Sequence, residues 1–183
     1  MTPCIALLRG INVGRAKRIA MADLRALLEG LGFSGVRTVL NSGNAVFCAP
    51  PADVDRIAQD IETAIARQLG LRVPVIVLTA AALDEIVAAR PPDHASGDPS
   101  KCLVAFVPGA AALATAATLC DTSWAPDRYA VGRRAAYLCC VDSLLTSPLA
   151  QAFTRAMGAA VTTRNWATVC KLQAAAKALP AAR

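Results

Sequence analysis

The chain has 183 residues, 55% hydrophobic and 17% charged, and this composition excludes an intrinsically disordered protein. Its length suits one large domain or two small ones. A formal net charge of +6 and a pI of about 9.2 favour an anionic partner or substrate. Arg9 interrupts the apolar N-terminal run and no cleavage site follows it, so we expect a cytoplasmic protein.

The first ninety residues predict a strand, a helix, two strands, a helix and a strand. We place strands at 3–8, 36–40, 45–48 and 73–78, and helices at about 21–31 and 54–69. The second helix is the clearest, because apolar residues recur every three or four positions and Gly70 follows as a stop signal. This order is the split βαβ plan of ferredoxin-like folds, which puts the strand containing Pro74 at a sheet edge.

A short helix around Leu83–Val87 leads into the segment 91–100, which is rich in proline, aspartate and glycine. We take it as a linker between subdomains 1–90 and 101–183 and expect its histidine, His94, to be solvated. The plan then repeats, with strands at 103–107, 128–131, 135–140 and 160–162 and helices at about 110–119, 148–157 and 166–179. We predict an α+β fold of two ferredoxin-like (βαββαβ) halves with antiparallel sheets plus a C-terminal helix.

One uncharged window, Cys102 to Cys120, has the length of a membrane span. It is rich in alanine and threonine, and Pro108-Gly109 interrupts it as a turn between a strand and a helix would. We therefore expect no contact with a membrane.

A glycine-containing, cation-rich loop separates the first strand from the first helix. In a split βαβ, the turn between the second and third strands emerges at the same end of the sheet, where the first helix also begins. Unpaired backbone N–H groups and a partial positive charge make that helix end suited to anions. The predicted ligand-binding residues are Arg9, Gly10, Asn12, Gly14, Lys17, Arg18, Asn41, Ser42, Gly43 and Asn44.

The same residues also allow a purely structural interpretation. Gly10 and Gly14 can serve a tight connection, and Asn41 and Asn44 can brace a hairpin by side-chain to backbone bonds. The glycine spacing does not match a Walker A loop, and no G-x-G-x-x-G is present. The sequence therefore contains no recognised nucleotide motif.

Our leading hypothesis is a binding module for a small anionic or phosphorylated ligand, with Asn12, Ser42 and Asn44 hydrogen-bonding it. One alternative is an enzyme of unknown reaction that uses Arg9 or Lys17 as electrophile at the same loop. The other is a weak nucleic-acid-binding protein. Few aromatic residues are present, and the strands lack the aromatic pattern of RNA-recognition modules. Arg133-Arg134 lies at a predicted hairpin tip, where the two arginines can contact phosphate or simply be solvated.

A second candidate site is Thr163-Arg164-Asn165, just before the final helix. Thr163 or Asn165 can cap that helix, whereas an arginine at a helix N-terminus opposes the dipole. Arg164 should therefore have a partner, either a carboxylate from the other half or a bound anion. Trp166 continues the apolar stripe of the helix and is expected in the core.

We expect no cofactor and no metal. The seven cysteines are scattered without a C-x-x-C pair, which favours reduced thiols in a reducing cytosol. The single histidine argues against a catalytic triad or a histidine-based metal site, and the carboxylates do not cluster. The oligomeric state is left open.

Several strings resemble a bacterial family filed as domain of unknown function 1697. They are Ala6–Gly14 (ALLRGINVG), Met21–Leu24 (MADL), Asn41–Asn44 (NSGN) and Thr162–Trp166 (TTRNW). The resemblance covers nearly the whole chain. It implies a cytosolic α+β protein of two ferredoxin-like halves, without an established activity.

Overall fold

The structure is a computed structural model, and it describes residues 1–13, 17–95, 97–158 and 161–179. Its backbone contacts divide the chain into two compact units, residues 84–170 and residues 1–83 together with the C-terminal residues from Lys171. The boundaries expected from the sequence, with subdomains 1–90 and 101–183 and a linker at 91–100, remain a prediction. Within the described ranges, no helix is both long and apolar enough to cross a membrane.

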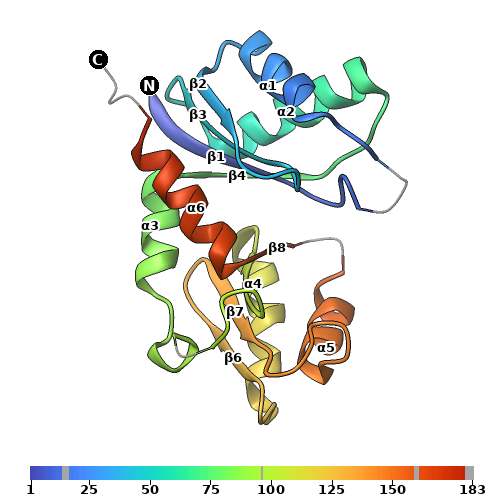
Figure 1. The fold of residues 1–183 in the computed structure, drawn as a ribbon, viewed down its shortest axis with the longest axis vertical. Coiled ribbons are helices and arrows are strands. Elements are labelled where there is room, and N and C mark those ends of the chain that lie inside the picture. Colours follow the sequence, from blue (N-terminus) through green and yellow to red (C-terminus); the bar gives the residue numbers. More distant parts are fainter. Residues whose placement is uncertain (14–16, 96, 159–160, 180–183) are drawn as a thin grey trace. The chain divides into compact units, whose positions relative to one another are not determined.

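The first unit is built on a four-stranded antiparallel sheet in the order β2-β3-β1-β4 (Figure 1). Its elements are β1 (Thr2–Leu8), α1 (Met21–Gly30), β2 (Ser34–Thr38), β3 (Asn44–Ala49), α2 (Val54–Leu69) and β4 (Val75–Thr79). β1 lies between β3 and β4, and β4 is an edge strand, as the ferredoxin-like plan predicts. β4 begins after Pro74, because proline has no N–H for the ladder.

Helices α1 and α2 cover one face of this sheet and share a core with it (Figure 1). Phe47 of β3 is fully buried and stacks on Phe33 with ring centroids 4.6 Å apart. α2 has the predicted bounds, because the Asp53 carboxylate caps its start and Gly70 ends it at a φ of 66°. The loop after β1, the β2–β3 turn and the start of α1 thereby adjoin this packed core.

The second unit repeats the plan with the sheet order β6-β7-β5-β8, again antiparallel. Its elements are the 3₁₀ turn η1 (Pro92–His94), β5 (Cys102–Phe106), α4 (Gly109–Ala117), the 3₁₀ turn η2 (Thr118–Asp121), β6 (Arg128–Val131), β7 (Ala135–Cys139), α5 (Pro148–Met157) and β8 (Thr162–Asn165). Helices α3 (Ala80–Ala88) and α6 (Trp166–Lys177) each contain residues of both units. The predicted α+β fold of two ferredoxin-like halves with a C-terminal helix is confirmed.

The core of the second unit lies between its sheet and helices α4 and α5. Phe153 of α5 is buried there, and its ring lies 6.0 Å from that of Tyr129 on β6. α5 has the predicted bounds because the Ser147 hydroxyl accepts from the Ala150 N–H at 3.0 Å and proline follows at the first helical position.

The structure differs from the expectation for the cysteines. Cys102 on β5 and Cys139 on β7 are opposite each other in the ladder and are joined in a disulfide, while Cys120 and Cys170 are exposed thiols. The sequence does not reveal this pairing because it depends on the register between two strands separated by α4 and β6.

His94 is also placed differently from the expectation of a solvated linker residue. It is only 2% exposed, at the end of η1, with its ring edge-on to the Tyr137 ring at 6.4 Å. Burial lowers the pKa of His94 from its ordinary 6.5; nearby Arg128 and Arg90 lower it further, against the opposing effect of Asp93. The imidazole is therefore held in its neutral form.

This burial gives the folded state a pH dependence. The pKa of His94 is lower in the folded chain than in the unfolded chain, so the unfolded chain binds the proton more tightly. The stabilisation from neutral His94 is therefore complete above about pH 6.5 and is lost as pH falls toward the lowered pKa. We expect His94→Leu to lose stability less steeply between neutral pH and about pH 5 than wild type does. Urea unfolding across this range measures both slopes, and equal slopes would contradict the assignment.

Candidate functional site

The loop after β1 and the turn between β2 and β3 lie side by side, as the topology predicts. The Leu8 N–H donates to the Gly43 carbonyl at 2.8 Å, where β1 ends beside the turn. Further along, the Asn12 side chain donates from Nδ2 to the Asn41 carbonyl at 2.7 Å. Two stretches about thirty residues apart in the chain therefore meet at one end of the sheet.

Asn12 closes the loop on itself. Its Nδ2 also donates to the Ile19 carbonyl at 2.9 Å, and its Oδ1 accepts from the Ile19 N–H at 3.0 Å. The Asn12 N–H donates to the Lys17 carbonyl at 3.1 Å. Both amide hydrogens of the side chain are thus used within the protein, so Asn12 fixes the shape of the loop.

The tip of the β2–β3 turn is braced by Asn44, which is fully buried. Its Nδ2 donates to the Val39 carbonyl and to the Ser42 hydroxyl, both at 2.9 Å. Gly43 has a φ of 78°, and a Cβ there would lie 2.8 Å from Ile11 Cδ1 and from Leu8 Cβ. The structural interpretation of Asn44 therefore holds, and Gly43 is where the turn packs against the first loop.

The two loops hold an unusual backbone. Within the described residues, the non-glycine residues with positive φ are Asn12 (57°), Lys17 (51°) and Leu40 (59°). All three lie on these two segments. Left-handed conformations are unfavourable for residues with a side chain, and they concentrate at sites where the surrounding structure imposes a shape for function.

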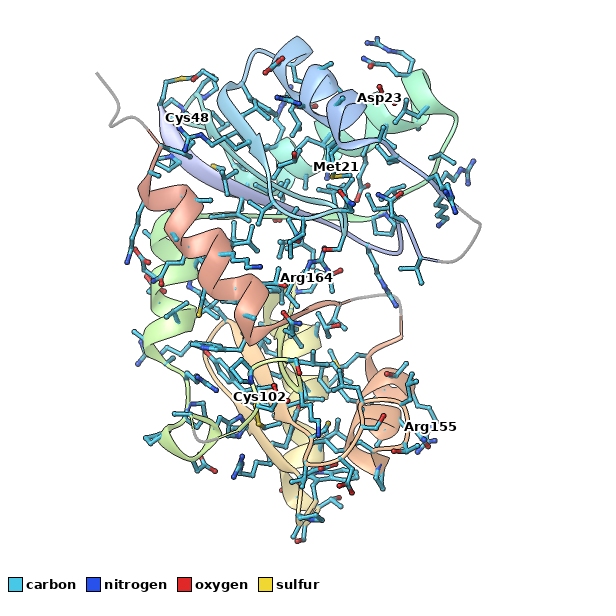
Figure 2. All side chains as sticks on the ribbon, viewed as in Figure 1. Met21, Asp23, Cys48, Cys102, Arg155 and Arg164 are labelled. Atoms are coloured by element: carbon cyan, nitrogen blue, oxygen red, sulfur yellow. A yellow bond between two sulfur atoms is a disulfide. The ribbon has the colours of Figure 1, made fainter. Side chains whose placement is uncertain are left out.

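A cavity of about 470 Å³ opens between the loops at the start of α1. It is lined by Asn12, Arg18, Ile19, Ala20, Met21 and Asn41. Figure 2 labels Met21, the first residue of α1, and Asp23 in its first turn. Ala20 at the N-cap has no side-chain oxygen to offer the first N–H groups of the helix. The cavity therefore combines an exposed guanidinium with the positive end of a helix.

The predicted residues divide into three groups around this cavity. Asn12, Arg18 and Asn41 line it, and Ser42, Gly43 and Asn44 form the adjoining turn. Arg9, Gly10 and Lys17 belong to the loop but are not part of the lining, and Gly14 lies outside the described residues.

The sequence did not single out Ile19 and Ala20. Ile19 is an apolar residue beside the cations, and its contribution comes from its backbone bonds to Asn12. Only the fold reveals that it forms part of the wall.

The second candidate segment lies in strand β8, which corrects the short strand expected at 160–162 to Thr162–Asn165; residue 160 lies outside the described residues. Thr163 and Arg164 pair with Ala105 and Val104 of β5, because backbone pairing at the edge of that sheet extends β8 to Asn165 (Figure 2 labels Arg164). Arg164 donates from Nη1 to the Thr163 carbonyl at 2.8 Å, and burial lowers its pKa to about 10.

Asn165 caps α6, which confirms one of the two residues predicted as its cap. Its Oδ1 accepts from the Thr168 N–H at 2.9 Å and from the Thr168 hydroxyl at 2.6 Å.

Trp166 is half-buried, and the Arg90 guanidinium lies 4.0 Å from its ring centroid. Across the described ranges, no group of three or more His, Cys, Asp and Glu is placed to hold a metal ion.

Comparisons with known proteins add the family. The fold is similar to a solved structure described as that of the conserved bacterial protein SP0830 from Streptococcus pneumoniae, with a TM-score of 0.74 and 22% identity over 96% of this chain and 98% of that one. A search of curated proteins found no match. A family model described as a protein of unknown function, DUF1697, matches residues 1–137, and the chain therefore belongs to the DUF1697 family.

Proposed function

We propose that this protein binds a small anionic or phosphorylated ligand in the cavity at the start of α1. The observation that carries the proposal is the pairing of Arg18 with the uncapped N-terminus of α1 in one cavity of about 470 Å³. A volume of this size suits a small molecule. Helix N–H groups and a guanidinium are the donors that recognise phosphate or carboxylate oxygens in many proteins.

The bonds within the site assign different roles to the candidate residues. In this proposal Arg18 and the first N–H groups of α1 contact the anion directly. Asn12 positions the wall by its bonds to Ile19 and Asn41. Asn44 and Ser42 hold the turn, so their contribution to binding is indirect.

Arg18→Ala tests the direct contact. We expect it to weaken the binding of pyrophosphate or ribose 5-phosphate about fivefold to tenfold, the loss typical of a charge-assisted hydrogen bond at a partly exposed site. The matched control is Arg25→Ala, because Arg25 is an exposed arginine on α1 and does not line the cavity. Its binding should stay within about twofold of wild type, since only long-range charge is lost.

Isothermal titration calorimetry measures these affinities, with ribose as the uncharged probe. Stronger binding of ribose 5-phosphate than of ribose supports recognition of the anion. The proposal is wrong if neither charged probe binds the wild-type protein, or if the two arginine variants lose the same affinity.

A further inference from the structure

A second hollow lies within the second unit, between the end of α3 and the β6–β7 hairpin. Its volume is about 410 Å³, and it is lined by Glu85, Ile86, Ala88, Ala89, Arg133, Arg134 and Tyr137. These residues all belong to residues 84–170. The hollow contains Arg133-Arg134, the basic pair at the hairpin tip that the first site does not use.

The floor of the hollow is formed by two buried residues joined by a hydrogen bond. Ile86 and Tyr137 are 4% and 2% exposed, and the Tyr137 hydroxyl donates to the Ile86 carbonyl at 2.6 Å. This bond ties α3 to β7 and satisfies the polar atom of the tyrosine. The floor therefore presents mainly apolar carbon to whatever lies on it.

The wall above this floor has short side chains, and the hairpin turn forms its rim. Ala88 and Ala89 are exposed and have short side chains that leave the hollow unfilled. Gly132 opens the hairpin turn, and a Cβ there would lie only 3.2 Å from Tyr137 Cε2. The turn consequently lies close against the tyrosine ring and presents the two following arginines at the rim.

The rim has one cation in excess. Arg134 donates from Nε to the Glu85 carboxylate at 2.7 Å, which neutralises that pair at the surface. Among the described residues, none forms a hydrogen bond or an ion pair with the exposed side chain of Arg133. An apolar floor beneath an uncompensated guanidinium is complementary to a molecule with an apolar body and one negative charge.

We propose that this hollow binds a small organic carboxylate, with its apolar body on Ile86 and Tyr137 and its carboxylate on Arg133. Glu85 then competes with the ligand for Arg134 and also repels the incoming charge. Weakening the Glu85–Arg134 pair should therefore strengthen binding, an effect that general damage to the fold would not produce.

Octanoate and its neutral counterpart octanamide are suitable probes, measured by calorimetry on the full chain. We expect octanoate to bind wild type about fivefold more tightly than octanamide, as one partly exposed ion pair allows. Arg133→Ala should remove that difference and leave the affinity for octanamide unchanged. Glu85→Gln should tighten octanoate binding about fivefold, for the same electrostatic reason.

Matched controls separate this site from charge effects and from the first site. Glu29→Gln removes an exposed carboxylate from α1, and Arg18→Ala removes the cation of the first cavity. Both should leave octanoate affinity within about twofold of wild type because neither residue lines the hollow. Ala88→Leu should weaken both probes by filling the space.

Three results would overturn the proposal. They are no octanoate binding to wild type, equal affinity for octanoate and octanamide, and an effect of Glu85→Gln no larger than that of Glu29→Gln. If Arg133→Ala does not fold, the last two comparisons still decide the question, because neither requires that variant.

Discussion

Gly43→Ala should lower the free energy of unfolding by about 2–5 kcal/mol, combining roughly 1–2 kcal/mol for a left-handed backbone and 1–3 kcal/mol for overpacking. Gly43 has a φ of 78°, and its new Cβ would lie 2.8 Å from Leu8 Cβ and 2.9 Å from Ile11 Cγ1. Leu8 Cβ cannot turn away, because it is fixed by the backbone of the central strand β1. Urea unfolding of the two proteins measures the loss.

Gly30→Ala is the matched control for this substitution. Gly30 ends α1, and a Cβ at that position would have no heavy atom within 4 Å. We expect a gain of about 0.4–1 kcal/mol, because alanine restricts the unfolded chain and suits a helix. If Gly43→Ala were as harmless as Gly30→Ala, the close packing of the β2–β3 turn against the first loop would be wrong.

Asn44→Asp should cost about 3–5 kcal/mol at neutral pH, the range for an uncompensated buried charge. The substitution is nearly isosteric, but it replaces both N–H donors, which now bond to the Val39 carbonyl and the Ser42 hydroxyl, with carboxylate oxygen. Asn44 is 0% exposed, so solvent cannot take over these bonds. The same change at Asn41, which is exposed on the same turn, should stay within about 0.5 kcal/mol of wild type.

The Asn44→Asp defect should also depend on pH. Burial raises the pKa of a carboxyl group above the value of about 3.9 that it has in the unfolded chain. The folded state then binds the proton more tightly, so the defect relative to wild type is smallest below about pH 4 and grows as pH rises through the folded pKa. A defect of the same size at about pH 4 and at neutral pH would contradict this account of Asn44.

Local signals predicted the helices of both halves well. The sequence pattern predicts helices 54–69 and 148–157 at their observed bounds. Gly70 marks the end of the first and Ser147 the start of the second, and each has a regular apolar spacing. The sheet order followed from the alternation of elements, since a split βαβ has few alternative topologies. The meeting of the first loop with the β2–β3 turn followed from that order.

The misplaced features depend on tertiary contacts. β8 is polar and resembles a helix cap in the sequence, but pairing with β5 makes Thr163 and Arg164 part of a strand. His94 lies among residues typical of exposed turns and is buried only because η1 packs beside Tyr137. Likewise, the sequence indicated that Asn12 belongs to the site, but not that its amide is already used by Ile19 and Asn41.

Amide NMR spectra recorded during a titration with inorganic phosphate test most directly whether the first cavity holds an anion at the start of α1. We predict the largest saturable shifts at the N–H groups of Met21, Ala22 and Asp23, with loss of saturation in Arg18→Ala. Shifts that are absent there, or that are largest at Arg133 and Arg134 instead, would contradict the claim.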